Sequence, residues 1–245
     1  MMLKEYAVKT HQGPYFQINE DTVHLDFANG LFLLLDGLGG SGVGDTAVLK
    51  IKTDISDFFL SVGGDQDSTF PFYYNYRYLL EGNALVNGIY FAHNNLWQLN
   101  TTRSISQRAA SSIAALSESK NIVTMVTSGN VKVFLMRSQK MSFLMGKDTL
   151  SFLGNDEGGK EFRTLPTAGI GLFEKLEFDI HELKIIEGDQ IILISDGCYG
   201  RLDQRELEFK LTEKRFSLSE KIDNIFSMSN QRGNLDNQSL MILQY

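Results

Sequence analysis

Four short acidic segments stand where expected strands end. They are Asn19-Glu20-Asp21, Asp36-Gly37, Ser195-Asp196-Gly197 and Asp236-Asn237. Two of these segments follow short, almost purely apolar runs, residues 31–35 and residues 191–194. Apolar runs of this length bounded by glycine are typical of buried strands. Each strand therefore delivers a carboxylate to its own end, where the following glycine lets the backbone turn sharply.

Carboxylates gathered at strand ends form a site for hard divalent cations, which prefer oxygen ligands. Taken alone, Asp36 or Asp196 is explained by a routine Asp-Gly turn after a buried strand. Taken together with Glu20 and Asp236, the pattern favours metal binding over a set of independent turns. A calcium loop of the EF-hand type is excluded, because no segment has the required Asp/Asn spacing and closing Glu.

Composition narrows the class of protein and of partner. The chain has 245 residues, of which 42% are hydrophobic and 22% charged, as expected for one large domain with a sizeable core. The net charge of -7, without a lysine or arginine block, argues against nucleic acid or an anionic membrane surface as a partner. The single cysteine, Cys198, fits a reducing compartment. Because no apolar stretch approaches the roughly 18–20 residues of a membrane span, we expect a soluble cytoplasmic protein.

The pattern of apolar residues predicts strands and helices in alternation along the chain. Period-two and short apolar segments predict strands near residues 3–9, 22–28, 31–35, 113–116, 122–126, 131–136, 142–145, 177–180, 191–194 and 239–243. Helical spacing predicts helices over residues 47–59, 76–99 and 202–226. Ser128-Gly129-Asn130 is expected to be a tight turn, and the polar segment 146–163 a surface loop. The aromatic run 70–78 fits either a docking surface or, preferably, packing against helices, and the charged segment 201–215 fits a solvated face.

The ordered acidic segments resemble the motifs of bacterial metal-dependent serine/threonine protein phosphatases of the type 2C (PPM) class. Smaller markers agree with this resemblance. They are Gly188-Asp189 before a strand, the small-residue turn 168–171 and a central hairpin at residues 123–137. The resemblance covers residues 13–243 and is weakest over residues 60–108. A single Asp-Gly pair would carry little weight, but the ordered set is specific.

The resemblance implies an α+β fold, a four-layer α-β-β-α sandwich in which helices flank two antiparallel β-sheets, with residues 1–245 as a single domain. It also implies a two-metal site at one end that holds Mn²⁺ or Mg²⁺. The implied ligands are Asp36, which would bridge both ions, the carbonyl of Gly37, Asp196, Asp236 and Glu20. Asp21 would order metal-bound water, although a structural hydrogen-bonding role fits it equally.

The implied chemistry is in-line attack of a metal-bridging hydroxide on phosphoserine or phosphothreonine. The site residues that carry this chemistry would be Asp36, Asp196, Asp236 and Asp21. The implied partners are a phosphorylated protein substrate and an opposing serine/threonine kinase, with neither nucleic acid nor membrane involved. Cys198 is expected to pack rather than react.

Four positions depart from the family pattern. Phe16 stands where the family has an arginine that holds the substrate phosphate, and Arg77, Arg103 and Arg108 are the possible substitutes. Asn130 stands where an aspartate is tied to a third metal, so a third site should be weak or absent. A Thr-x-Asp-His-Ser segment has no counterpart around residues 147–152, and Leu38 replaces a histidine that some members carry.

Two rival functions remain alongside the phosphatase. A pseudoenzyme would use the same fold as a regulatory binding module without turnover, and Phe16 and Asn130 motivate that alternative. The retained acids Asp36, Asp196 and Asp236 speak against it. A metal-dependent hydrolase of a small phosphate ester is the second alternative, which assays on phosphopeptides and small phosphates would separate from the first.

Overall fold

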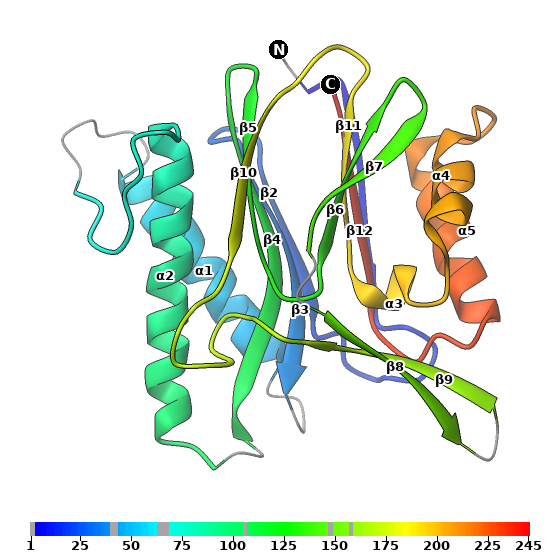
Figure 1. Ribbon diagram of the computed structural model, residues 1–245, viewed down its shortest axis with the longest axis horizontal. Coiled ribbons are helices and arrows are strands. Elements are labelled where there is room, and N and C mark those ends of the chain that lie inside the picture. The colour runs from blue at the N-terminus through cyan, green and yellow to red at the C-terminus, as the bar shows by residue number, and fades with distance from the viewer. Residues whose placement is uncertain (1–2, 40–43, 63–68, 105–106, 147–148, 157–158) are drawn as a thin grey trace.

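Two antiparallel β-sheets of five strands each form the centre of the molecule (Figure 1). The first sheet has the strand order β1 (Glu5–His11), β12 (Gln238–Gln244), β11 (Gln190–Ile194), β6 (Lys132–Arg137), β7 (Lys140–Met145). The second has the order β10 (Asp179–Lys184), β5 (Ile122–Ser128), β4 (Ala109–Ser119), β3 (Leu31–Gly39), β2 (Asp21–Asp26). The computed structural model describes residues 3–39, 44–62, 69–104, 107–146, 149–156 and 159–245, and of residues 149–164 it describes the backbone only.

The apolar run of β3 is buried on both faces of its sheet. Side chains alternate across a strand, so Leu31, Leu33 and Leu35 face the helical layer. Phe32 and Leu34 face the other sheet. Both sets are at most 1% exposed. A strand covered on both sides needs no polar face, which explains the unbroken apolar sequence and confirms the predicted core strand.

Helices cover the outer face of each sheet, so the molecule has four layers in the order α-β-β-α (Figure 1). The helices α1 (Gly44–Val62) and α2 (Leu80–Thr101) cover the second sheet, and α4 (Gln204–Thr212) and α5 (Leu218–Gln231) cover the first. A single turn, α3 (Asp196–Tyr199), follows β11. The predicted architecture is confirmed. None of the helices that the structure describes has the length and apolar character needed to cross a bilayer.

The predicted helix over residues 202–226 is two helices. Asp203 and Ser217 each begin a helix through a capping box, in which the cap side chain accepts from the backbone of Glu206 or Glu220 and the Glu side chain returns a bond to the cap backbone. A capping box hydrogen-bonds backbone N–H groups that are unpaired only at the start of a helix. Each box therefore marks the beginning of a separate helix. The prediction of one continuous helix was therefore wrong over residues 213–217, which separate α4 from α5.

The predicted surface loop 146–163 is largely a β-hairpin. Strands β8 (Thr149–Asp156) and β9 (Gly159–Pro166) pair antiparallel, with Thr149 opposite Pro166 and Asp156 opposite Gly159. The turn-forming Gly, Asn and Asp residues gather at its centre, as a hairpin requires. Residues 147–148 and 157–158 lie outside the described part of the chain.

The expected central hairpin at residues 123–137 is not a hairpin. β5 belongs to the second sheet and β6 to the first, so the segment between them crosses the sandwich. Gly129 makes the crossing with φ of +93°, and a Cβ there would meet the Ser112 hydroxyl at 2.3 Å. The glycine is required at this position because both the positive φ and the close approach exclude a side chain. The predicted turn exists, but it changes sheets.

Candidate functional site

The four acidic segments meet at one end of the sandwich. Asp21 begins β2 and lies opposite Asp36 in the antiparallel β2–β3 pair. In the other sheet, β11 ends beside the start of β12, with Ile194 opposite Leu240. Asp196 follows the first of these strands and Asp236 precedes the second. Antiparallel pairing therefore brings the end of one strand and the start of its neighbour to the same edge.

Gly197 permits the close approach that places Asp196 beside the 236–237 segment. A Cβ at Gly197 would lie 1.8 Å from the carbonyl oxygen of Asn237, a distance no side chain tolerates. Across the sandwich, the hydroxyl of Ser195 donates to Oδ2 of Asp21 at 3.0 Å. The two sheets are thus joined at the site by a hydrogen bond between residues of two predicted motifs.

Burial and mutual repulsion perturb the carboxyls. Asp21, Asp36 and Asp196 are 5%, 7% and 8% exposed. Burial, followed by the charges of Asp196, Asp21 and Asp236, raises the pKa of Asp36 well above its usual range. Burial is also the main cause that raises the pKa of Asp21 to about 8, with Asp236 and Asp196 adding to it. Such a cluster is costly when its acids are ionised without a cation.

The remaining two acids lie nearer solvent. Asp236 is open to solvent at the cavity wall, yet surrounding protein atoms displace much of its water, and this with the nearby Asp196 charge raises its pKa to about 6. Glu20 is half-buried beside Gly44 at the start of α1, and its pKa is raised, first by burial and then by Asp45. The main-chain carbonyl of Glu20 accepts a hydrogen bond from the Gly37 N–H at 3.1 Å.

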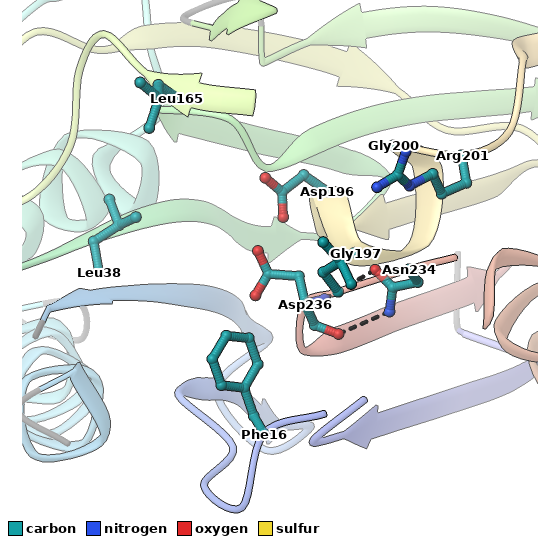
Figure 2. Close-up of a pocket in the computed structure, with 10 residues that line it drawn as sticks. Phe16, Leu38, Leu165, Asp196, Gly197, Gly200, Arg201, Asn234 and Asp236 are labelled. Atoms are coloured by element: carbon teal, nitrogen blue, oxygen red, sulfur yellow. Dashed lines mark hydrogen bonds between the residues drawn. The ribbon is translucent and has the colours of Figure 1, made fainter. Parts of the chain in front are cut away.

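Two adjoining cavities open onto these acids, and Figure 2 shows the residues that line the larger of them. The larger, of about 410 Å³, contains Asp196 and Asp236 in its wall together with Leu38, Leu165 and Arg201. The smaller, of about 340 Å³, is lined by Glu20, Gly37, Gly39 and others. Phe16 and Asp236 line both. Phe16, 51% exposed, therefore occupies the rim between them.

Asp196 is held by residues of the β5–β6 crossing. The side-chain amide of Asn130 donates to Oδ2 of Asp196 at 2.8 Å, and its own Oδ1 is buried with no hydrogen-bond partner among the described residues. The Tyr199 hydroxyl donates to the Asn130 carbonyl at 2.6 Å. The Nζ of Lys132 lies 3.7 Å from the centre of the Tyr199 ring. Burial lowers the pKa of Lys132, while Asp196 opposes that shift.

Asn237 fixes the segment that carries Phe16 and Glu20. Its Oδ1 accepts from the Glu20 N–H at 2.9 Å. Its Nδ2 donates to the carbonyls of Gln12 at 2.8 Å and Ile18 at 3.2 Å. In the sequence, Asn237 stands out only because it follows Asp236, and no structural role is predicted for it. Its role depends on contacts with residues more than 200 positions away, which no local pattern reveals.

Other candidate residues lie away from the acids or have structural roles. Arg77, Arg103 and Arg108 line neither cavity, whereas Arg201, expected on a solvated face, lines the larger. Cys198 is buried against the Ser239 carbonyl, as expected of a packing residue. The aromatic run packs on α2 and on the segment before β10, where Phe72 stacks on Tyr90 and Tyr73 meets Phe178 edge to face.

The donor set fits divalent cations. Several carboxyls raise one another's pKa, and the orphaned Asn130 Oδ1 lies beside them. Hard cations would neutralise this excess negative charge through oxygen ligands alone. As the side chains stand, the described residues include no group of three or more His, Cys, Asp or Glu close enough together to enclose an ion. Cation binding would therefore involve side-chain rotation.

Comparison with solved structures identifies the fold. No protein-family model and no curated protein matches the sequence. PppA, described as a key regulatory component of the T6SS in Pseudomonas aeruginosa, is similar at 20% identity and a TM-score of 0.77, covering 99% of this chain and 98% of its own. The PPM Ser-Thr phosphatase MsPP of Mycobacterium smegmatis, solved with cacodylate, has 16% identity and a TM-score of 0.76, covering 100% and 99%. The catalytic domain of PstP, solved with two manganese ions, has 17% identity and a TM-score of 0.71, covering 98% and 97%. The chain has the fold of bacterial type 2C phosphatases.

Proposed function

We propose that this chain, with its type 2C phosphatase fold, is a Mn²⁺- or Mg²⁺-dependent phosphoserine/phosphothreonine protein phosphatase. The observation that carries the proposal is the meeting of Asp36, Asp196 and Asp236 at one cavity-lined end of the sandwich, where burial and repulsion raise the pKa of Asp36 and Asp236. If the four acidic segments were only unrelated turns, nothing would explain why mutually repelling carboxyls are buried together. A cation site explains this clustering, because bound cations relieve the repulsion between the carboxylates.

The ligand assignment follows the positions of the acids. Among the three proposed aspartate ligands, Asp36 is the least exposed and would bridge two ions. Asp196 and Asp236, which line the larger cavity, would complete the coordination of one ion. The carbonyl of Gly37 and the carboxylate of Glu20, which share the smaller cavity, would hold the other. Asn130, a neutral residue, would leave any third site weak.

The chain's own residues would position substrate and water. When bound, the two cations would supply positive charge beside the phosphoryl oxygens and lower the pKa of the attacking water. Asp21, held by the Ser195 hydroxyl, would orient that water for in-line attack. The larger cavity would admit the phosphorylated side chain past Phe16 and Leu38. Most of the rate enhancement would come from positioning and electrostatics.

The pseudoenzyme alternative is favoured by the apolar side chain of Phe16 at the cavity rim. PppA, which has this fold, is described as a regulatory component. In that case the chain would bind a phosphoprotein or partner without turnover. If the chain is a phosphatase, its partners would be a phosphorylated protein and the kinase opposing it, and residues 1–245 would act as one cytoplasmic catalytic domain.

Phosphate release from a phosphothreonine peptide tests the proposal. The purified protein is assayed with Mn²⁺ and with chelator, beside Asp196→Asn and the control Asp57→Asn, which removes an exposed acid of α1. We expect manganese-dependent release that Asp196→Asn lowers by about a thousandfold or more and Asp57→Asn leaves unchanged. Normal turnover by Asp196→Asn would refute the site. A folded wild type that binds Mn²⁺ but releases nothing would favour the pseudoenzyme, and faster release from small phosphate esters would favour a metabolite hydrolase.

A further inference from the structure

Arg201 extends into the larger cavity beside the acids (Figure 2). It lies in the turn between α3 and α4, and its guanidinium points toward the side where Asp196 and Asp236 lie. Among the described residues that line this cavity, it is the only cation. This position was not predicted, because Arg201 opens a charged segment that has the composition of a solvated face.

The guanidinium of Arg201 has no partner among the residues that the structure describes, in contrast to two arginines that form paired hydrogen bonds to carboxylates. Arg137 binds Asp189, and Arg232 binds Glu206, each through two nitrogens. The main-chain carbonyl of Arg201 accepts a hydrogen bond from Nη1 of Arg232 at 3.1 Å, which leaves the Arg201 guanidinium uninvolved. Its five N–H donors are therefore available to a ligand in the cavity.

The backbone of Arg201 is nevertheless fixed. The Gly200 N–H donates to the Asp196 carbonyl at 2.6 Å, and the buried Leu202 side chain anchors the other side. Arg232, which holds the Arg201 carbonyl, is itself held by Glu206 at 2.7 and 2.6 Å. The hydrogen bond from Arg232 is the main cause that lowers the pKa of Glu206 to about 2, so this anchor persists at neutral pH. A fixed backbone with an available guanidinium is a preorganised binding group.

We propose that Arg201 binds the substrate phosphate and takes the role that an apolar Phe16 cannot fill. This inference rests on the proposed phosphatase function, because the ligand is the phosphate of that substrate. The guanidinium fork matches phosphate oxygens through two parallel N–H···O bonds. With cations on the carboxylates, a phosphate in the cavity would have positive charge on both sides. Arg201 and the metal site reach the same cavity from one structural unit, because Asp196 begins α3 and Arg201 follows its end.

Binding of inorganic phosphate to the manganese-loaded protein tests this without requiring turnover. Calorimetric titration compares wild type with Arg201→Ala and Arg201→Lys. Arg205→Ala is the control, since Arg205 is exposed on α4 and lines neither cavity. We expect Arg201→Ala to weaken phosphate binding about tenfold or more. Lysine should recover part of the affinity through its charge without the fork, and Arg205→Ala should bind like wild type.

Peptide kinetics add a second readout. Arg201→Ala should raise KM for a phosphothreonine peptide by a similar factor, with a smaller effect on kcat. If wild type binds phosphate but does not turn over, and Arg201→Ala loses binding, the phosphatase proposal fails and the role of Arg201 stands. Equal phosphate affinity in wild type and Arg201→Ala, equal loss in Arg205→Ala, or no phosphate binding by wild type would each overturn the role of Arg201. Melting temperatures near that of wild type would show that the variants are folded.

Discussion

The Asn130 side-chain amide donates a hydrogen bond to Oδ2 of Asp196 at 2.8 Å, and this bond links the crossing between the two sheets to the end of β11. A neutral amide holds the carboxylate without adding a second negative charge. The arrangement limits the repulsion around Asp196, where Asp36 and Asp236 already lie close. Asn130 is thus a positioning residue for the proposed metal ligand.

Asn130→Asp should destabilise the metal-free protein. The change replaces a buried donor with a second carboxyl at hydrogen-bonding distance from Asp196. We expect a loss of about 2 kcal/mol in the free energy of unfolding, from the lost bond and the new repulsion. Chemical denaturation with chelator present measures it.

Asn130→Ala separates the two causes, because it removes the hydrogen bond without adding charge. Asn130→Asp should be less stable than Asn130→Ala at pH 8 with chelator, and Mn²⁺ should narrow the gap. Equal stability of the two variants under all conditions would show that Asp196 does not repel a carboxyl at this position.

The metal-free protein should lose stability as pH rises. The pKa of Asp21 is raised from 3.8 to about 8 in the folded protein, and that of Asp36 is raised as well. Well below pH 3.8 both acids are protonated whether the chain is folded or unfolded, so they do not lower the free energy of unfolding there. Between pH 3.8 and about 8, Asp21 releases its proton only in the unfolded chain, which lowers the free energy of unfolding by up to about 1.4 kcal/mol per pH unit, and Asp36 acts in the same direction.

Thermal unfolding at pH 5 and pH 8, with Mn²⁺ and with chelator, checks this dependence. Mn²⁺ should raise the melting temperature more at pH 8, since the ligands must be deprotonated. Asp36→Asn should stabilise the metal-free protein at pH 8 and reduce the effect of Mn²⁺, whereas Asp57→Asn should do neither. A metal-free protein equally stable at both pH values would contradict the clustering of the acids.

The core strand was predictable because its cause is local, whereas the two-sheet, four-layer arrangement was implied by the resemblance to type 2C phosphatases. Residues 31–35 are apolar without interruption since both faces of β3 are buried, and this pattern can be read directly. The split between α4 and α5 could also have been read, because Asp203 with Glu206 and Ser217 with Glu220 have capping-box spacing. The hairpin at residues 149–166 could not be predicted in this way, because its polar composition is also typical of a loop.

The gathering of the acids was predictable for the same reason, since each belongs to a short motif beside a glycine or an asparagine, and their role as metal ligands stays a prediction. The residues that support them were not. Asn130 reaches Asp196 across 66 positions, and Asn237 reaches the Gln12 carbonyl across 225. Arg201 lines the cavity because the turn between α3 and α4 lies beside the acids. Such roles follow from tertiary contacts, which a single sequence does not encode in any local pattern.

Phe16→Arg should lower KM for phosphopeptides. Phe16 lines both cavities, so an arginine there would place a second guanidinium beside the proposed phosphate position. We expect KM to fall about tenfold, the effect of a charge-assisted hydrogen bond. Initial rates on a phosphothreonine peptide measure it.

Tyr15→Arg is the matched control, because Tyr15 is 68% exposed and lines neither cavity. It adds the same charge one residue away and should leave KM within about twofold. An unchanged or raised KM for Phe16→Arg would show that the phosphate is not held from this side. An equal fall in both variants would indicate general attraction of the peptide instead.

Asn237→Ala should impair both stability and turnover. One buried side chain holds Glu20, Gln12 and Ile18, and its removal leaves a backbone N–H and two carbonyls without that partner. We expect the free energy of unfolding to fall by about 3 kcal/mol. Turnover with saturating Mn²⁺ should fall about tenfold, because Glu20 and Phe16 would no longer be held against the 236–237 segment. Asn95→Ala, which removes a single bond to Asp54 on the helical layer, should cost about 1 kcal/mol or less and leave turnover unchanged. Unchanged turnover in a stable Asn237→Ala protein would show that the 12–20 segment does not need this support to complete the site.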